Sequence, residues 1–250
     1  MDVSLYQAAA AMSATAQWQD LIAENLSAAA VPGARRQEMS FSDIQAGQAS
    51  NLAGGSQSNY YLPSAGPVTN FSPGEMRPTG NSMDFALEGP GFFSVQTPDG
   101  QTIYSRDGEF RTNAQGQLVT KSGNLVMSDG NPLRFNPNSS SAITVSTSGE
   151  VSQGDVIVGK MKTVEFKNPK QLQPLGSGLF ANNDPTIPPA VSTTTKVRQG
   201  FVEGSNTSPT TEMASLITAM RMFEANQKVL QMQGDRMSQV ITNLGGTSTS

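Results

Sequence analysis

Hydrophobic positions near the start of the chain follow the spacing of an amphipathic helix. Residues 1–30 contain neither Gly nor Pro and are rich in Ala, so they predict one helix, which ends at Val31-Pro32-Gly33. Apolar side chains in this helix recur three and four residues apart, which is the spacing of a coiled-coil seam. The seam is interrupted at Thr15 and Gln19, and its apolar members are Leu5, Ala8, Met12, Ile22 and Leu26.

The C-terminal helix is longer and its seam is more complete. Residues 208–244 predict a helix with Ser208 as a candidate N-cap and Pro209 at the first helical position, and Gly245-Gly246 closes its end. The seam continues over about five heptads and is broken only by Gln227 and Gly234. Its apolar members are Met213, Leu216, Met220, Phe223, Leu230, Met237, Ile241 and Leu244.

The C-terminal helix also carries apolar residues off the seam, so its apolar surface is wider than one partner helix would cover. These residues are Ile217, Met222, Val229, Met232 and Val240. One interpretation is an intramolecular helix pair in an ordinary α+β protein. The other is a pair of polymerisation elements that other subunits complete, for which methionine offers an adaptable surface. We expect Trp18 to pack on a neighbouring helix rather than to bind a ligand.

The middle of the chain predicts a meander of short antiparallel strands. Turn glycines recur every seven or eight residues from Gly100 to Gly130, with short apolar runs between them. The predicted strands contain Ile103-Tyr104, residues 109–111, Leu118-Val119, Leu125-Val126, and residues 143–145, 156–158 and 162–166. The fold class is therefore α+β, with long N- and C-terminal helices that pair as a coiled-coil-like domain and a central antiparallel β domain.

These patterns predict three parts along the chain. Residues 1–34 and 205–250 form a terminal helical assembly domain, and residues 81–204 form the central β domain. Residues 35–80 form an extended connector between them. Residues 45–80 have few apolar residues and many Ser, Asn, Gly and Pro, so we expect at most short strands there.

Composition removes several classes of function. None of the 250 residues is Cys or His, which excludes disulfides, a Cys nucleophile, a Ser-His-Asp triad and metal sites built on thiolate or imidazole. A formal net charge of -4 argues against nucleic acid as a partner. No apolar run is long enough for a transmembrane segment. The first basic residue is Arg35, so the N-terminus does not resemble a secretory signal.

The remaining candidates for chemistry are weak. Asp99, Asp107 and Asp129 could be imagined as a carboxylate cluster or a Ca²⁺ site, but each precedes a turn glycine, where Asp is favoured for its backbone hydrogen bonds. The runs at residues 89–91 and 176–178 lack the strand, third glycine and helix of a phosphate-binding loop. We therefore predict that the chain is not an enzyme and has no catalytic, cofactor-binding or metal-binding residues.

Three blocks of sequence resemble signature segments of the bacterial flagellar rod and hook proteins. They occur in the order of that family and are distributed along the chain from residue 5 to residue 227. The blocks are residues 5–9, 22–27 and 31–33 at the N-terminus, residues 84–93 and 104–110 in the middle, and residues 200–206, 212–213, 216–217 and 221–227 at the C-terminus. Ala28 and Ala34 depart from the family pattern, which often has Asn and an aromatic residue at these places.

The resemblance implies a structural subunit of the flagellar basal-body rod that polymerises through its terminal helices into a helical tube. The proximal rod is favoured, and a distal-rod or hook-like subunit is the alternative. The implied partners are copies of itself, other rod proteins and the flagellar export apparatus, which would deliver it to the periplasmic rod without a cleaved signal peptide. A secreted β-rich binding module is a further alternative, but it does not account for the C-terminal heptads.

Overall fold

The chain forms two compact units. The computed structural model describes residues 3–50, 57–139 and 141–245. The helical unit consists of Met1–Glu24, Gln37–Val68 and Pro209–Ser250, and the β unit consists of Asn25–Arg36 and Thr69–Ser208. The three-part division expected from the sequence stays a prediction.

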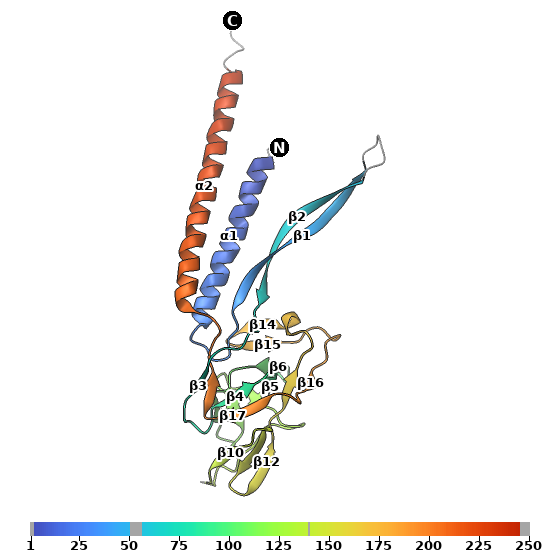
Figure 1. The fold of residues 1–250 in the computed structure, drawn as a ribbon, viewed down its shortest axis with the longest axis vertical. Coiled ribbons are helices and arrows are strands. Elements are labelled where there is room, and N and C mark those ends of the chain that lie inside the picture. Colours follow the sequence, from blue (N-terminus) through green and yellow to red (C-terminus); the bar gives the residue numbers. More distant parts are fainter. Residues whose placement is uncertain (1–2, 51–56, 140, 246–250) are drawn as a thin grey trace. The chain divides into compact units, whose positions relative to one another are not determined.

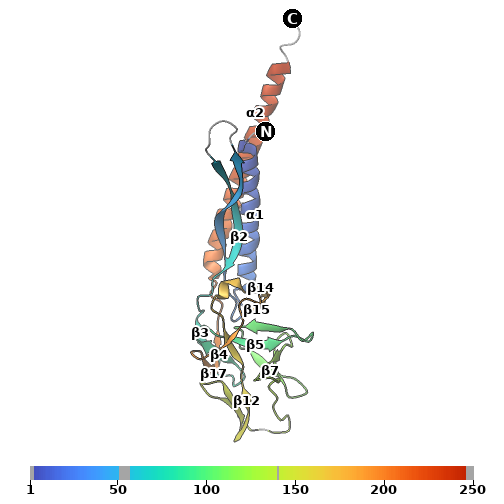
Figure 2. The same cartoon turned by 90° about the vertical axis from the view of Figure 1, so that its right-hand side faces the viewer.

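Two long helices dominate the helical unit. Helix α1 spans Val3–Ala28 and helix α2 spans Pro209–Gly245. Figures 1 and 2 show them side by side and antiparallel. Both lie where the hydrophobic spacing predicts them, and α2 begins at the expected proline. Their contact, together with the antiparallel β domain between them in sequence, confirms the predicted α+β class.

The segment between α1 and the β unit differs from the prediction. Strands β1 (Gln37–Ser50) and β2 (Gln57–Thr69) pair as a two-stranded sheet, so the expectation of at most short strands is wrong. Two paired strands satisfy each other's backbone groups whatever their side chains are, which a count of apolar residues does not register. Tyr60-Tyr61-Leu62, inside β2, is the local signal of strand preference.

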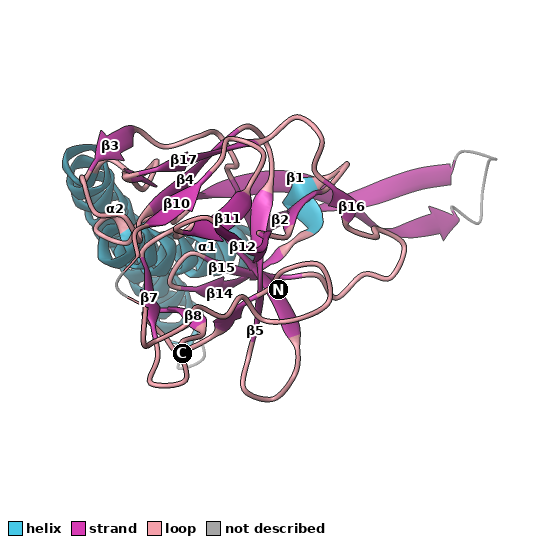
Figure 3. Ribbon diagram, turned by 90° about the horizontal axis from the view of Figure 1, so that it is seen from below, coloured by secondary structure: helices cyan, strands magenta, loops and turns pink. Residues whose placement is uncertain are grey.

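The β unit is built from short strands joined by tight turns, which Figure 3 shows from below. Its largest sheet has nine strands, and all strand pairs with a defined register in the described residues are antiparallel. The nine-stranded sheet contains β5 (Phe92–Gln96), β6 (Thr102–Ser105), β7 (Phe110–Thr112), β8 (Leu118–Thr120), β9 (Leu125–Val126), β13 (Thr163–Glu165), β14 (Gln173–Gly176), β15 (Leu179–Ala181) and β16 (Ala190–Val191).

Three smaller sheets complete the β unit, together with a single-turn 3-10 helix, η1 (Pro169–Gln171). One sheet consists of β10 (Ile143–Val145), β11 (Glu150–Gln153) and β12 (Val156–Lys160), and the others pair β17 (Lys196–Gln199) with β4 (Phe85–Glu88) and β18 (Phe201–Glu203) with β3 (Met76–Pro78). Strands β6 to β10, β12 and β13 all fall on predicted runs, so the strand prediction from turn-glycine spacing is confirmed.

Two apolar clusters form the core of the β unit. The larger is lined by fully buried side chains such as Phe85, Phe93 and Leu118. The smaller is mainly aromatic: Phe92 packs edge-on against Phe166 and Phe180, with ring centroids 5.9 and 5.8 Å apart. Edge-to-face contacts of this kind stabilise beyond area burial alone.

A buried carboxylate holds the β unit together beside the aromatic cluster. Oε1 of Glu203 accepts a hydrogen bond from Nη2 of Arg35 at 2.7 Å, and Oε2 accepts one from Nη1 of Arg106 at 3.1 Å. All three side chains are at most 5% exposed. The backbone N–H of Gly74 also donates to Oε1, at 2.8 Å. We call Arg35, Arg106 and Glu203 the Glu203 anchor.

Arg106 is satisfied by more than its ion pair. It donates to the carbonyls of Leu87 and Gly89, and its guanidinium lies 5.0 Å from the centroid of the Phe92 ring. Burial lowers the pKa of Arg106 to about 10, against the opposing effect of the Glu203 carboxylate, so the side chain stays protonated at neutral pH.

The anchor joins three stretches of chain that are far apart in sequence. They are residues 33–36, which follow α1, residues 70–75, which follow β2, and residues 203–206, which precede α2. The N–H of Gly33 donates to the carbonyl of Glu203 at 2.7 Å, and the Asn206 side chain accepts from the N–H of Arg36 and donates to the carbonyl of Asn70. The β unit thereby fixes the chain next to three of the four points where it passes between the two units, at residues 36–37, 68–69 and 208–209.

Glycine is required where these stretches meet. Gly33 has φ +68°, and a Cβ there would lie 2.3 Å from the backbone carbon of Arg106. A Cβ on Gly74 would lie 2.0 Å from the carbonyl oxygen of Gly204. The predicted Pro-Gly turn after α1 is therefore a packing requirement as well as a helix stop.

Replacing Glu203 with Gln tests the anchor. The variant keeps the shape of the side chain but leaves two buried guanidiniums without a counter-charge, so the free energy of unfolding should fall by about 3 to 5 kcal/mol. Denaturant unfolding monitored through the β unit measures this loss. The matched control is Glu88→Gln, which breaks the half-exposed pair with Arg198 and should cost at most about 1 kcal/mol. Equal losses in both variants would contradict the role given to the anchor.

Asp107 makes the stability of the β unit depend on pH. Burial raises the pKa of its carboxyl to about 6, and nearby Glu109 and Asp84 add to the rise, while the backbone N–H of Glu109 and the charge of Lys121 oppose it. A raised pKa means that the folded protein binds the proton more tightly than the unfolded chain. The stabilisation is therefore complete below the unfolded pKa and is lost as the pH rises through about 6.

Asp107→Asn should consequently stabilise the protein at pH 8 and have little effect at pH 4. The Asn side-chain oxygen can still accept the 2.9 Å hydrogen bond from the N–H of Glu109. We expect a gain on the order of 1 kcal/mol at pH 8, discounted because the carboxyl is only half-buried. Urea unfolding at the two pH values measures it, with Asp99→Asn at an exposed turn as the control for the chemical change. A larger gain at pH 4 than at pH 8 would refute the assignment.

Candidate functional site

One face of α2 is covered and contacts α1. The residues on this face recur three and four apart and are buried or half-buried: Leu216, Ala219, Phe223, Asn226 and Leu230. Ala219 is 0% exposed. Nδ2 of Asn226 donates to Oγ1 of Thr15 on α1 at 3.4 Å, and Oγ1 of Thr15 in turn donates to the carbonyl of Ala11. The two helices therefore meet along a seam with one polar pair in it.

The covered face of α2 coincides with the predicted seam at some positions and is shifted by one residue at others. Leu216, Phe223 and Leu230 lie on it, whereas Met213 and Met220 are 53% and 52% exposed. Ala219 and Asn226 take the positions that the heptad pattern gave to Met220 and Gln227. A small side chain such as that of Ala219 lets two helices approach closely. The heptad pattern was read from large apolar residues, so it did not include this alanine.

The structure describes the burial of three of the five predicted seam residues of α1. Ile22 is buried, and Met12 and Leu26 are half-buried. Thr15, which interrupted the predicted pattern, is buried on the same side. The side chains of Leu5, Ala8, Ile241 and Leu244 lie outside the described ones.

Two apolar strips on α2 flank the covered face. Each residue turns a helix by about 100°, which places the strips about 120° to either side of the α1 contact. The Met213 flank consists of Met213, Ile217 and Met220, and the Met222 flank consists of Met222, Val229 and Met232. Their exposed fractions range from 39% to 57%. Met237 follows the spacing of the covered face but is 46% exposed.

A hollow lies between α1 and α2 on the side of the Met222 flank. It has a volume of about 450 Å³ and is lined by Ala11, Ala14, Thr15, Trp18, Met222 and Asn226. The two alanines leave the space, and Trp18 and Met222 form its walls. Trp18 of α1 and Met222 of α2 line the same hollow, so the indole lies beside a neighbouring helix, as predicted.

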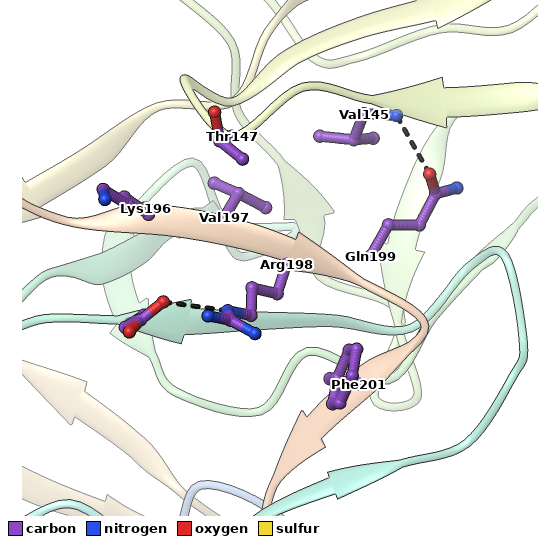
Figure 4. A pocket seen from close by; sticks show the side chains of 8 residues that line it. Val145, Thr147, Lys196, Val197, Arg198, Gln199 and Phe201 are labelled. Carbon is purple, nitrogen blue, oxygen red and sulfur yellow. Dashed lines mark hydrogen bonds and ion pairs between the residues drawn. The ribbon is translucent and has the colours of Figure 1, made fainter.

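A second hollow, in the β unit, marks a joint between sheets (Figure 4). It measures about 490 Å³ and runs along β17. In this hollow the side-chain amide of Gln199 hydrogen-bonds to the backbone of β10, as a neighbouring strand would. Its Oε1 accepts from the N–H of Val145, and its Nε2 donates to the carbonyl of Ile143. Arg198 pairs with Glu88 at 2.8 Å. The Gln199 side chain thus holds β10 against β17, and the Arg198–Glu88 pair joins β17 to β4.

The candidate chemical residues do not converge. Asp99 and Asp129 are exposed at turns, and Asp107 is half-buried. Among the described residues no group of three or more Asp or Glu side chains could hold a metal ion. The run at residues 176–178 is a turn with positive φ at all three positions. In the described part of the chain, no helix is both long and apolar enough to cross a membrane.

Sequence reasoning missed the Glu203 anchor, although its members lie in or beside the blocks that carry the family resemblance. The available signal was the presence of single charges inside apolar and glycine-rich runs, as with Glu203 in Phe201-Val202-Glu203-Gly204. Such a charge, predicted to be buried, requires a partner. Nothing local indicates that the partners are Arg35 and Arg106.

Two family models match the chain. The model described as flagellar hook protein FlgE/F/G D1 domain matches residues 86–153, and the model described as flagellar basal body rod FlgEFG protein C-terminal matches residues 198–244. The first match lies in the β unit, and the second covers the end of β17, all of β18 and nearly all of α2.

Full-length relatives agree with these matches. The chain is 32% identical to the flagellar basal-body rod protein FlgF of Caulobacter vibrioides, with 98% of this chain and 99% of the relative covered. It is 30% identical to FlgF of Mesorhizobium japonicum, with 99% and 100% covered, and 30% identical to FlgG of Buchnera aphidicola, with 90% and 93% covered. The chain belongs to the flagellar basal-body rod protein family of FlgF and FlgG, a family of structural, non-enzymatic proteins.

Proposed function

We propose that the chain is the FlgF-type subunit of the proximal rod and that it polymerises through α1 and α2 into a helical tube. The FlgF relatives support the subunit type, because two of them align with 98% and 99% of this chain. FlgG of Borreliella burgdorferi aligns with 96% of it at 32% identity, so coverage favours the FlgF type by a narrow margin.

The two exposed flanks of α2 carry the proposal of polymerisation. A helix of 37 residues is roughly 55 Å long, and α1, with 26 residues, covers one face over part of that length. Six large apolar side chains remain at least 39% exposed on the other two faces. Exposed apolar strips on two sides of one helix suit a subunit with neighbours on both sides.

The partners follow from this arrangement. We propose copies of the same chain and other rod proteins as the neighbours of α2, and the flagellar export apparatus as the carrier that delivers the chain to the periplasmic part of the rod without a cleaved signal peptide. Family membership supports both steps. The mass of the subunit recovered from isolated basal bodies tests the second, because cleavage would shorten its N-terminus.

A distal-rod subunit is the second candidate. The observation in its favour is that FlgG of Agrobacterium fabrum is 35% identical to this chain, although over only 68% of each. Complementation separates the two. The chain should restore motility to a bacterium without its own FlgF and fail to restore it to one without FlgG, and the reverse result would assign it to the distal rod.

Removing the Met213 flank tests polymerisation. The double variant Ile217→Ser and Met220→Ser removes two exposed apolar side chains, each worth about 1 kcal/mol or more when buried by a neighbour. The concentration needed for assembly should rise at least tenfold. Because both side chains are exposed, the thermal unfolding of the chain should stay unchanged. Sedimentation across a concentration series measures the effect.

The matched control is Arg221→Ser, at an exposed position outside both flanks. It should assemble at about the same concentration as the unaltered chain. Equal assembly of the double variant and the control would count against α2 as the polymerising surface.

A further inference from the structure

We propose that the hollow between α1 and α2 is a socket for Met220 of a second copy of this chain. The inference rests on the proposed function and adds to it which surface meets which. In our assignment the Met213 flank of one copy lies over the Met222 flank and the socket of the next copy.

The chemistry of the socket selects an apolar occupant. None of its six lining residues is charged, and its two polar members, Thr15 and Asn226, already bond to each other. Ala11 and Ala14 present only methyl groups, so the space above them can be filled from outside. A flexible, unbranched side chain fits an irregular hollow of this kind best, which is the property of methionine.

The exposed apolar side chains of the helical unit indicate that the occupant of the socket comes from α2 of another copy. Among the described side chains of this unit, every large apolar residue that is more than half exposed lies on α2: Met213, Ile217, Met220, Met222 and Met232. Met222 is itself a wall of the socket, and Met232 lies on the same flank. The Met213 flank is therefore the strip left to supply the inserted residue.

The socket and the Met213 flank lie on opposite sides of the helix pair. A contact between them therefore does not end with a closed dimer. The socket lies to one side of the α1 contact and the Met213 flank lies to the other side. A contact between two different surfaces leaves one of each free on every pair, so a third copy can add in the same way. Repeated addition builds a ring or a helix, and a helical tube requires such a contact.

The socket and Met220 lie at different heights along the axis of α2, so neighbouring copies would be displaced from each other along that axis. The socket lies at the level of Met222 and Asn226, whose midpoint is about four residues beyond Met220. At about 1.5 Å per residue, neighbouring parallel helices would be displaced along their axes by roughly 6 Å. A stepped contact of this kind produces a helix rather than a flat ring.

The absence of cysteine allows a direct test by cross-linking. Two single-cysteine variants of the full chain, Ala14→Cys and Met220→Cys, carry different tags and are mixed under assembling conditions. A short bis-maleimide should join the two differently tagged chains. The matched control replaces the second variant with Met232→Cys, which is similarly exposed but lies on the other flank. We expect at least ten times more mixed dimer with Met220→Cys than with Met232→Cys.

The outcomes separate the socket from polymerisation itself. If assemblies form but cross-linking is equal for the two pairs or favours Met232→Cys, the socket assignment is wrong while the proposed function stands. If Ala14→Cys joins mainly to itself, the contact is a closed two-fold pair and the assignment is also wrong. If the unaltered chain never assembles, the proposed function fails and the socket fails with it.

Filling the socket provides an independent measurement. Ala14→Leu places three further carbons in the hollow and should raise the concentration needed for assembly at least tenfold, with no loss of helix content by circular dichroism. Ala9→Leu makes the same change at an exposed position of α1 outside the socket and should have no such effect. Unchanged assembly of Ala14→Leu would overturn the inference.

Discussion

The carboxylate of Glu203 lies between two guanidinium groups in the interior of the β unit. Removing three charges from water is costly, and the cost is offset by the close ion pairs, by two carbonyls that accept from Nη1 and Nη2 of Arg106, and by the aromatic face of Phe92. The pairs join residues 168 and 97 positions apart. They hold the segment before β1 and the segment before α2 against the same part of the β unit.

In the proposed assembly, the helical unit uses one surface for its own helix pairing and other surfaces for contacts with neighbours. The face of α2 that meets α1 combines the large apolar Leu216, Phe223 and Leu230 with Ala219 and Asn226, whereas many methionines of the helix remain exposed on either side. Contacts with neighbours must accept different surfaces along a rod made of several proteins, and a flexible thioether side chain adapts to them at little cost.

The sequence predicted those features that depend on local pattern. Turn glycines located the strands from β6 to β9, and Pro209 marked the start of α2. The long strands β1 and β2 could not be predicted from apolar content, because paired backbones hold them. The heptad pattern selected Met220 for the seam of α2 because it scores large apolar side chains, whereas the buried residue at this level of the helix is Ala219. The partners of Glu203 could not be found, because pairing between distant charges leaves no periodic trace.

The hydrogen bond between Thr15 and Asn226 has a consequence for accuracy over long distances. Apolar seams tolerate sliding by a whole heptad, since one methyl group replaces another, but a slipped pair would leave both of these polar groups without each other. Every copy is therefore held to the same internal alignment of α1 and α2. In a filament, small deviations in each member would add up to bending and fracture. A single polar pair, repeated in each subunit, works against that accumulation of error.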